Sequence, residues 1–382
     1  MISQGILALY FNENSSILPL RIPRYAFEVQ MSKIKYPSIN GLRAVSILVV
    51  IAYHLVGMKY ISGETTISWL QPLTRIWIDG FMAVNVFFVI SGYLITTLLM
   101  HEEFKNKVVS LKDFFIRRTL RIFPAYYFLL LVYAIFQFFQ IIDINWGSWA
   151  TAITYTKYFN WKKDWFTSHA WSLGIEEHFY LFWPLLFMRG DRFRKYATIV
   201  MIILVPIIRI LMALFEIRWL NEQMIFTRID AIATGCFFAL YQDVIIRKLS
   251  RHWTAYFYVS VVLLLALPYL PELFGKINLE FIFVPLGTTW GTIANFAIAT
   301  IMMYSVFGPQ RIWFKFLNLR FMNYIGLLSY SIYLWQQFFI YKSDNWWNQF
   351  PLNLLLILAC ALFSYYLIEK PFLKLKSKFS TT

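Results

Sequence analysis

The chain has 382 residues, of which 59% are apolar, 20% aromatic and only 14% charged, and its formal net charge is +15. Soluble domains carry about 25% charged residues, so this composition, with its mean hydropathy of +0.56, excludes a water-soluble globular protein. A spanning helix uses about 20 mostly apolar residues, and the apolar content suffices for about ten such helices, with no room for a separate soluble catalytic domain.

Ten apolar runs predict membrane-spanning helices, each boundary being defined only to within a few residues. In chain order they are residues 39–57, 80–100, 122–142, 171–188, 196–215, 228–245, 253–270, 283–306, 324–341 and 352–369. The predicted fold class is therefore an all-α integral membrane bundle of about ten transmembrane helices. Residues 31–372 form the predicted transmembrane domain and residues 373–382 a basic tail. Residues 1–30 are interpreted as an N-terminal extension or a mis-called start, because Met31 precedes a sequence typical of a cytoplasmic start.

The distribution of Lys and Arg predicts the orientation, because these residues accumulate in cytoplasmic loops. With both termini cytoplasmic, the six inner segments carry 22 basic residues and the five outer segments carry 8. Basic loops beside an anionic leaflet explain the net charge, so no nucleic-acid partner is predicted. Residues 105–121 are more basic than orientation requires. They are expected to form an amphipathic interfacial segment before the third span, and they could also bind a polyanion.

The first span contains two ionisable residues, and such residues inside a membrane indicate function unless they are paired. Arg43 and His54 are eleven residues apart, so they lie on one stripe of the helix at a separation of about 16 Å. One interpretation is a snorkelling arginine and a buried histidine bonded to a carbonyl. The other is a general base on a helix that also carries a cation for an anionic donor.

Polar residues recur in four later spans. Glu176 lies near the outer end of the fourth span, where it could serve a site or contact lipid headgroups. Arg228 and Asp230 open the sixth span and could pair with each other or with Glu176. Asn85 and Ser91 lie in the second span, and the ninth adds several polar groups, among them Tyr330 and Gln336.

Motifs of soluble enzymes do not occur in the chain. It contains no GxSxG elbow, P-loop or HExxH motif, which argues against a Ser-His-Asp hydrolase and an ATP-driven pump. Cys236 and Cys360 lie within apolar runs and imply neither a disulfide framework nor a metal site. We predict no metal and no tightly bound cofactor.

Seven motifs, in order along residues 36–372, resemble those of the acyltransferase-3 family of integral membrane O-acyltransferases. They are INGLRAVSILVVIAYHL, with Arg43 and His54; GFMAVNVFFVISGYLIT; RRTLRIFPAYY, with Arg117, Arg118, Arg121 and Pro124; WSLGIEEHFYLFWPL, with Glu176; RIDAIATG, with Arg228 and Asp230; SYSIYLWQ; and YYLIEKPF, with Glu369 and Pro371. The resemblance implies transfer of an acyl group, most often acetyl from acetyl-CoA, to a hydroxyl of a cell-surface carbohydrate or its lipid-linked precursor. It also implies that His54 and Arg43 are required for activity and that Glu176 belongs to the site. Two positions depart from the family, which often has aspartate at Asn85 and histidine at Gln336.

The residues suggest how such a reaction would run. His54 is expected to act as the general base that takes the proton from a sugar hydroxyl as it attacks the thioester, with Glu176 orienting the imidazole. A ping-pong route through an acyl-imidazole stays open. The arginines that open the third span lie on the predicted inner side, where the CoA phosphates arrive, and arginine binds phosphate through paired hydrogen bonds.

The site residues are assigned accordingly. The predicted catalytic residues are His54, Glu176 and Arg43; the predicted acyl-CoA-binding residues are Arg117, Arg118, Arg121, Ser91 and Tyr93; and the predicted acceptor-binding residues are Arg228, Asp230, Asn85 and Tyr330. The expected partners are acyl-CoA as co-substrate, a carbohydrate or lipid-linked glycan, and the lipids of the plasma (bacterial inner) membrane. Two alternatives remain: a transporter or flippase of lipid-linked sugars, and a protein that keeps the family fold without its activity.

Overall fold

The computed structural model describes residues 36, 38–61, 80–159, 164–217, 223–270, 289–341, 343 and 345–379. Within these ranges the elements are helices, and no strand is formed. The predicted extension 1–30 lies outside the described residues, and the basic tail is described as far as Phe379. Residues 37–382 form one unit, to which the following description refers.

Each apolar run falls on a helix, and shorter helices lie between the runs. The α-helices are α3 (Ile39–Ile61), α5 (Gly80–Asn106), α6 (Leu111–Phe138), α7 (Trp146–Ile153), α8 (Ala170–Phe187), α9 (Asp191–Leu214), α10 (Ile225–Leu240), α11 (Gln242–Leu249), α12 (Trp253–Ala266), α15 (Trp290–Phe307), α16 (Ile312–Leu317), α17 (Arg320–Phe339), α18 (Leu352–Phe363) and α19 (Lys370–Lys376). A π-helical segment, Ser364–Glu369, joins α18 to α19. The eighth run is described only from residue 289 onward.

Six segments of the described chain are long and apolar enough to cross a membrane. They are Gly80–Asn106, Leu111–Phe138, Asp191–Leu214, Gln242–Tyr269, Trp290–Phe307 and Leu352–Lys376, and α3 contributes a shorter apolar stretch, Ile39–Leu55. The residues of α5 are mostly buried, whereas α9 exposes a row of apolar side chains that includes Ile203 and Leu211. Helices with such a face are suited to contact lipid. The count of about ten spans and the cytoplasmic placement of both ends stay predictions.

The third span begins earlier than the sequence pattern predicts. Helix α6 is continuous from Leu111, so residues 111–121 belong to the same helix as the predicted third span; their interfacial location stays a prediction. The Ser110 side chain accepts a hydrogen bond from the Asp113 backbone N–H at 3.3 Å. This N-cap starts the helix ahead of its apolar part. The arginines of this segment are therefore fixed on the same rigid element as the membrane-spanning residues.

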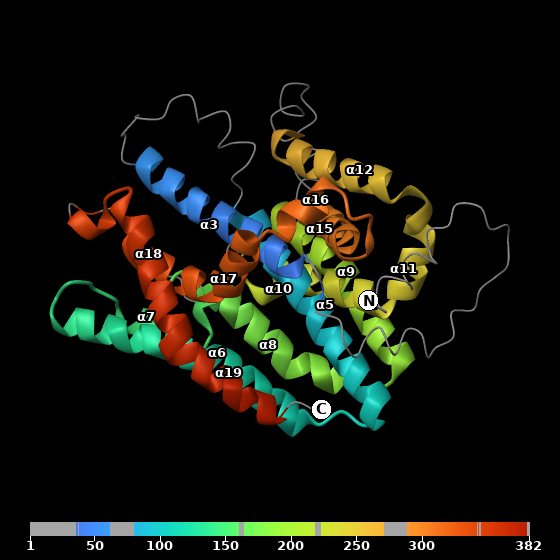
Figure 1. The fold of residues 1–382 in the computed structure, drawn as a ribbon, viewed down its shortest axis with the longest axis horizontal. Helices are drawn as coiled ribbons and strands as arrows, with labels where there is room; N and C mark the ends of the chain where they lie inside the picture. The colour runs from blue at the N-terminus through green and yellow to red at the C-terminus, as the bar shows by residue number, and fades with distance from the viewer. Residues whose placement is uncertain are drawn as a thin grey trace. The chain divides into compact units, whose positions relative to one another are not determined.

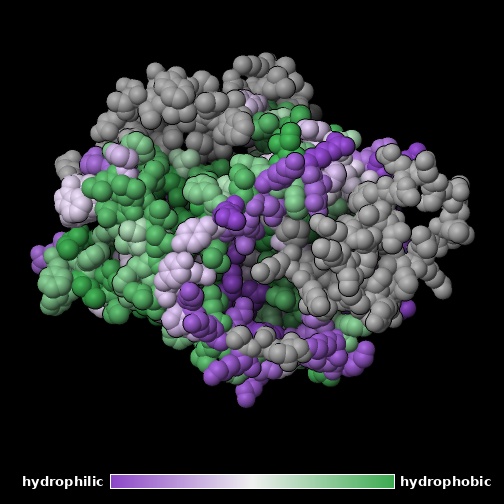
Figure 2. All heavy atoms as spheres, in the orientation of Figure 1, coloured by the Kyte–Doolittle hydropathy of each residue, from purple (hydrophilic) through white to green (hydrophobic). Residues whose placement is uncertain are grey.

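The helices around α5 and α3 bring the polar spans together. Helix α5 contacts α10 and α3, α3 in turn packs along α17, and α19 lies against α6 (Figure 1). Hydrophilic side chains gather along the lower edge of the view, where α5 and α19 end and α6 begins, and continue into a hollow near its middle (Figure 2). Much of the left part of this view is covered by hydrophobic side chains.

The contact between α5 and α10 requires glycine on both sides. A Cβ atom at Gly92 would lie 1.9 Å from the Ile232 carbonyl oxygen, and one at Gly235 would lie 2.1 Å from the Val89 carbonyl oxygen. Small residues of this kind allow backbones in a membrane to approach and gain van der Waals contact. The α5–α10 pair therefore forms a rigid centre for the bundle.

We expect Gly92→Ala to destabilise the protein by about 1–3 kcal/mol, because the backbones must separate to admit the methyl group. Gly147→Ala is the matched control, since the nearest atom to a Cβ at Gly147 is the Asn145 side-chain oxygen at 3.3 Å. Thermal unfolding of the detergent-purified variants measures the difference. Equal midpoints for the two variants would contradict the tight α5–α10 contact.

Candidate active site

His54 lies near the end of α3 and contacts the neighbouring helix α17. Its Nδ1 atom is 3.1 Å from Gln336 Oε1. Because the amide oxygen can only accept, this contact places the proton of neutral His54 on Nδ1 and leaves Nε2 as the basic nitrogen. Gln336 is fully buried, and its amide nitrogen has no hydrogen-bond partner among the described residues. The histidine therefore has the tautomer that a general base needs.

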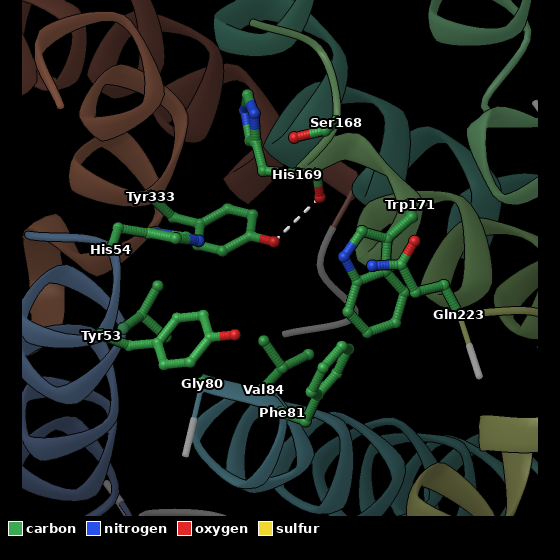
Figure 3. A pocket seen from close by; sticks show the side chains of 11 residues that line it. Tyr53, His54, Gly80, Phe81, Val84, Ser168, His169, Trp171, Gln223 and Tyr333 are labelled. Carbon is green, nitrogen blue, oxygen red and sulfur yellow. Dashed lines mark hydrogen bonds between the residues drawn. The ribbon is translucent and has the colours of Figure 1, made fainter. Parts of the chain in front are cut away.

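His54 lines a cavity of about 120 Å³ to which α3, α5, the start of α8 and α17 contribute. The lining residues are Val50, Tyr53, His54, Gly80, Phe81, Val84, Ser168, His169, Trp171, Gln223 and Tyr333. The Tyr53 and Tyr333 rings extend into the cavity from one side, and Trp171 and Phe81 lie on the opposite side (Figure 3). Besides His54, five of these residues have an aromatic side chain: Tyr53, Phe81, His169, Trp171 and Tyr333. None of the lining residues is Asp, Glu, Lys or Arg.

The segment before α8 is held over His54 by a buried ion pair and a glutamine. Lys157 pairs with Asp164, and Asp164 also accepts hydrogen bonds from the Thr167 backbone N–H and hydroxyl at 2.7 and 2.6 Å. Burial opposes ionisation of Asp164, but the hydrogen bonds from Lys157 and Thr167 outweigh it and hold the pKa of this carboxyl below its usual range. Gln337 bonds the Trp165 main chain at 2.9 Å. Both residues lie between the predicted third and fourth spans, where charged side chains are not by themselves a sign of function.

The Lys157–Asp164 pair and the Gln337 contact hold the segment that places Trp165 and His169 beside His54. The Trp165 ring meets the His54 ring edge-on at 5.9 Å between centroids. The main-chain oxygen of His169 accepts a hydrogen bond from the Tyr333 hydroxyl at 2.9 Å (Figure 3). Burial, together with the nearby His54, lowers the pKa of His169 to about 3. Its imidazole is therefore neutral at physiological pH, and the cavity wall carries no charge there.

A second polar region surrounds Arg43, near the N-terminal end of α3. We call Arg43, Arg118, Arg121, Glu176 and Glu369 the charged cluster. Arg43 interacts electrostatically with Arg121, Glu176 and Glu369, and Glu176 in turn interacts with Arg118. Within the described residues, the three arginines of the cluster form no ion pair. Arg43, Arg118, Arg121 and Glu369 lie at helix ends that the basic residues predict to be inside, whereas Glu176, predicted near the outer end of the fourth span, reaches the same cluster.

The carboxylates of the charged cluster bond hydroxyl groups. Glu176 accepts hydrogen bonds from Ser91 at 3.0 Å and from Tyr180 at 3.2 Å, and Glu369 accepts one from Ser331. The expected contact of Glu176 with His54 is therefore replaced by the contact of His54 with Gln336.

Three further predicted site residues, Arg117, Tyr330 and Tyr93, bond protein groups. Arg117 pairs with Glu102 at 2.6 Å and donates to the Phe379 carbonyl at 2.9 Å. The Tyr330 hydroxyl donates to the Ile122 carbonyl at 2.8 Å. Tyr93 is fully buried and its hydroxyl donates to Gln242 at 2.5 Å, so it is not placed to contact a ligand.

Asp230 belongs to a buried network that joins three helices. It pairs with Arg209 of α9 at 2.8 Å and accepts hydrogen bonds from Thr292 and Asn295 of α15 at 2.6 and 3.0 Å. Both oxygens of this carboxylate accept hydrogen bonds from protein groups, which is the arrangement a structural ion needs. The sequence analysis missed Arg209, although a lone arginine within an apolar run was a usable signal.

Two other predicted acceptor residues lie elsewhere in the core. The Arg228 guanidinium carbon is 4.7 Å from the centroid of the Phe81 ring, one of the rings that line the cavity. Asn85 is buried, and its side-chain oxygen has no hydrogen-bond partner among the described residues. Neither side chain is among those that line the cavity.

We expect Asp230→Asn to cost about 3–5 kcal/mol of stability, because it leaves the Arg209 cation buried without its counter-ion. Asp191→Asn is the matched control: its pairs with Arg194 and Lys195 are half-exposed, and such pairs contribute about 0–1 kcal/mol. Thermal unfolding in detergent checks both, and the double variant Arg209→Met with Asp230→Leu should recover most of the loss. An Asp230→Asn protein with normal stability would show that this carboxylate is not structural.

Comparisons with known proteins agree with the resemblance seen in the sequence. A family model described as an acyltransferase domain matches residues 36–369. The O-acetyltransferase OatA of Staphylococcus aureus is 29% identical over 365 residues, which cover 88% of this chain and 57% of that protein. The peptidoglycan O-acetyltransferase OatA of Listeria monocytogenes is 28% identical over 331 residues, which cover 78% of this chain and 48% of that protein.

The chain thus spans about half the length of these curated relatives. No solved structure matches it. Because the family model covers every polar element described above, from α3 to Glu369, the chain belongs to the acyltransferase-3 family.

Proposed function

We propose that this protein is a plasma-membrane O-acetyltransferase that moves an acetyl group from acyl-CoA to a hydroxyl of a cell-envelope glycan. The observation that carries the proposal is the arrangement along α3. His54 faces an uncharged cavity, while Arg43, three turns away on the same helix, faces the charged cluster. One helix therefore joins a site for a base to a site for anions. The names of the two relatives support the reaction type.

The charged cluster suits the phosphates of acyl-CoA. Arginine guanidinium groups bind phosphate through paired, charge-assisted hydrogen bonds. Among the described residues Arg43, Arg118 and Arg121 form no ion pair, although Glu176 and Glu369 lie near enough to interact with them electrostatically. By the distribution of basic residues, this end faces the cytosol, where acyl-CoA is made available. The thioester arm would then extend along α3 over about 16 Å toward His54.

The reaction follows from the tautomer of His54. Nε2 takes the proton of the acceptor hydroxyl while the hydroxyl oxygen attacks the thioester carbonyl. The carbon–sulfur bond breaks, the acetyl group passes to the glycan oxygen, and the thiolate of CoA receives a proton, which regenerates neutral His54. In the ping-pong variant Nε2 itself attacks the carbonyl and the hydroxyl then displaces the imidazole. Gln336 holds the ring in both cases, and Glu176 balances the arginines of the charged cluster.

We expect His54→Ala to lower acetyl transfer by about 10²- to 10⁴-fold, the usual contribution of a general base. Membranes that contain the protein are incubated with radiolabelled acetyl-CoA and envelope glycan, and the label fixed to glycan is counted. His252→Ala is the matched control, because His252 is exposed and lies outside the site. Acetyl transfer that persists in His54→Ala would refute the assignment of His54 as the base. Transport of glycan across the membrane without incorporation of the acetyl label would favour a transporter.

We expect Arg121→Gln to raise the KM for acetyl-CoA at least several-fold and to leave the KM for the glycan nearly unchanged, because only the anionic substrate loses a cation. The matched control is Arg311→Gln, which removes an exposed arginine from the same predicted side of the membrane. Size-exclusion profiles establish that both variants are folded. An increase in the glycan KM alone would place the acceptor, and not the donor, at the charged cluster.

A further inference from the structure

The cavity around His54 is built from helix ends that share one predicted side of the membrane. It takes residues from the second half of α3, the first turn of α5, the start of α8 and the second half of α17. The distribution of basic residues places all four of these ends outside. The charged cluster includes residues of α6 and of the junction before α19, which the same rule places inside. A substrate that reaches the cavity from its own side therefore arrives from outside the cell.

Three polar atoms face the cavity and make no hydrogen bond to a described residue. They are His54 Nε2, the Tyr53 hydroxyl and Trp171 Nε1. Figure 3 shows the Tyr53 hydroxyl and the Trp171 nitrogen directed toward the space between them, with the His54 ring beside Tyr333. Polar atoms that point into a cavity without partners are available to a ligand. Together they offer two neutral donors and one acceptor.

The rest of the wall is uncharged and combines aromatic rings with Val50, Val84, Ser168 and Gln223. Phe81 and Trp171 lie 5.9 Å apart between centroids at an angle of 50°, and Tyr333 lies across from them (Figure 3). A ligand with a carboxylate or an ammonium group would lose its hydration here without gaining a counter-ion, which is costly. The Arg228 guanidinium contacts Phe81 but does not line the cavity.

The size of the cavity limits what can enter. Its volume is about 120 Å³, and a cavity of about 150 Å³ in another protein accommodates one benzene ring. The present cavity is smaller than that, so it matches the edge of a six-membered ring. Apolar C–H faces pack on aromatic rings, while hydroxyl groups bond neutral donors and acceptors. A pyranose ring has both kinds of surface.

We propose that this cavity is the acceptor subsite, that it takes the hydroxyl-bearing edge of an uncharged pyranose ring, and that Tyr53 and Trp171 determine its specificity. The inference rests on the proposed function and adds to it the location and charge class of the acceptor. It moves the acceptor away from Arg228, Asp230 and Asn85. The Tyr53 hydroxyl and Trp171 Nε1 bond the sugar hydroxyls, so that one hydroxyl is presented to His54 Nε2.

Binding to the purified full-length protein tests the proposal without turnover. The probe is a radiolabelled N-acetylglucosamine tetrasaccharide, compared with its carboxymethylated (anionic) and deacetylated (cationic) forms by equilibrium dialysis. We expect the neutral form to bind at least tenfold more tightly than either charged form. Tyr53→Phe and Trp171→Phe each remove one donor and should weaken binding roughly two- to tenfold, as expected for an uncharged hydrogen bond. The KM for acetyl-CoA should not change.

Two variants make the same chemical changes away from the cavity. Tyr258→Phe and Trp146→Phe alter residues that are 61% and 89% exposed, and we expect neither to affect binding of the tetrasaccharide. The proposal is overturned if the wild-type protein does not bind the neutral probe, if a charged form binds more tightly, or if Tyr53→Phe and Trp171→Phe both bind like the wild type.

Failure of the subsite and failure of the proposed function give different results. Loss of acetyl transfer to envelope glycan by wild-type membranes would refute the function, whereas the dialysis measurement would still decide whether the cavity binds a neutral sugar. Normal acetyl transfer together with unaffected binding in the Tyr53 and Trp171 variants would refute the subsite and leave the function intact.

Discussion

The cost of placing ionisable side chains inside an apolar bundle governs this structure. Such groups are tolerated in a membrane only when they are paired, hydrogen-bonded or in contact with water. The protein meets this cost in two ways. Asp230 and Arg209 satisfy each other with help from Thr292 and Asn295, whereas the arginines of the charged cluster form no ion pair in the described residues. The Asp230 network holds α9, α10 and α15 together, whereas the arginines of the charged cluster are available to an anionic ligand.

The separation of charge along α3 follows from this cost. An anionic donor and an uncharged acceptor cannot both be desolvated well in one cavity, because a wall that stabilises phosphate also attracts water and competing anions. Here the cations lie beside Arg43, and the wall around His54 carries no Asp, Glu, Lys or Arg. Because α3 is one helix that packs closely on α17, it keeps the distance between the two regions fixed. In the proposed reaction the acyl arm would have to reach from one region to the other.

The sequence predicted the elements of this fold more fully than the contacts between them. Apolar runs located the helices because hydropathy reports burial and lipid contact directly. The stripe of Arg43 and His54 followed from helical periodicity alone. Partners across helices depend on how the helices rotate against each other, and periodicity carries no such information. Gln336 was therefore not expected beside His54, nor Arg209 beside Asp230, and the Lys157–Asp164 pair looked like ordinary loop charges. The early start of α6 depended on a single cap, Ser110.

The amide at position 336 fits an uncharged acceptor cavity better than an ionisable residue would. A carboxylate beside His54 would place a second charge next to the cavity, and a histidine would add a second group able to take up a proton. The Gln336 oxygen orients the same ring nitrogen at 3.1 Å but stays neutral at every physiological pH. It stabilises the required tautomer through a dipole, which a buried site tolerates at lower cost than a net charge. The departure from the family pattern at this position is thus compatible with the proposed role of His54, because the amide adds no titrating group beside that ring.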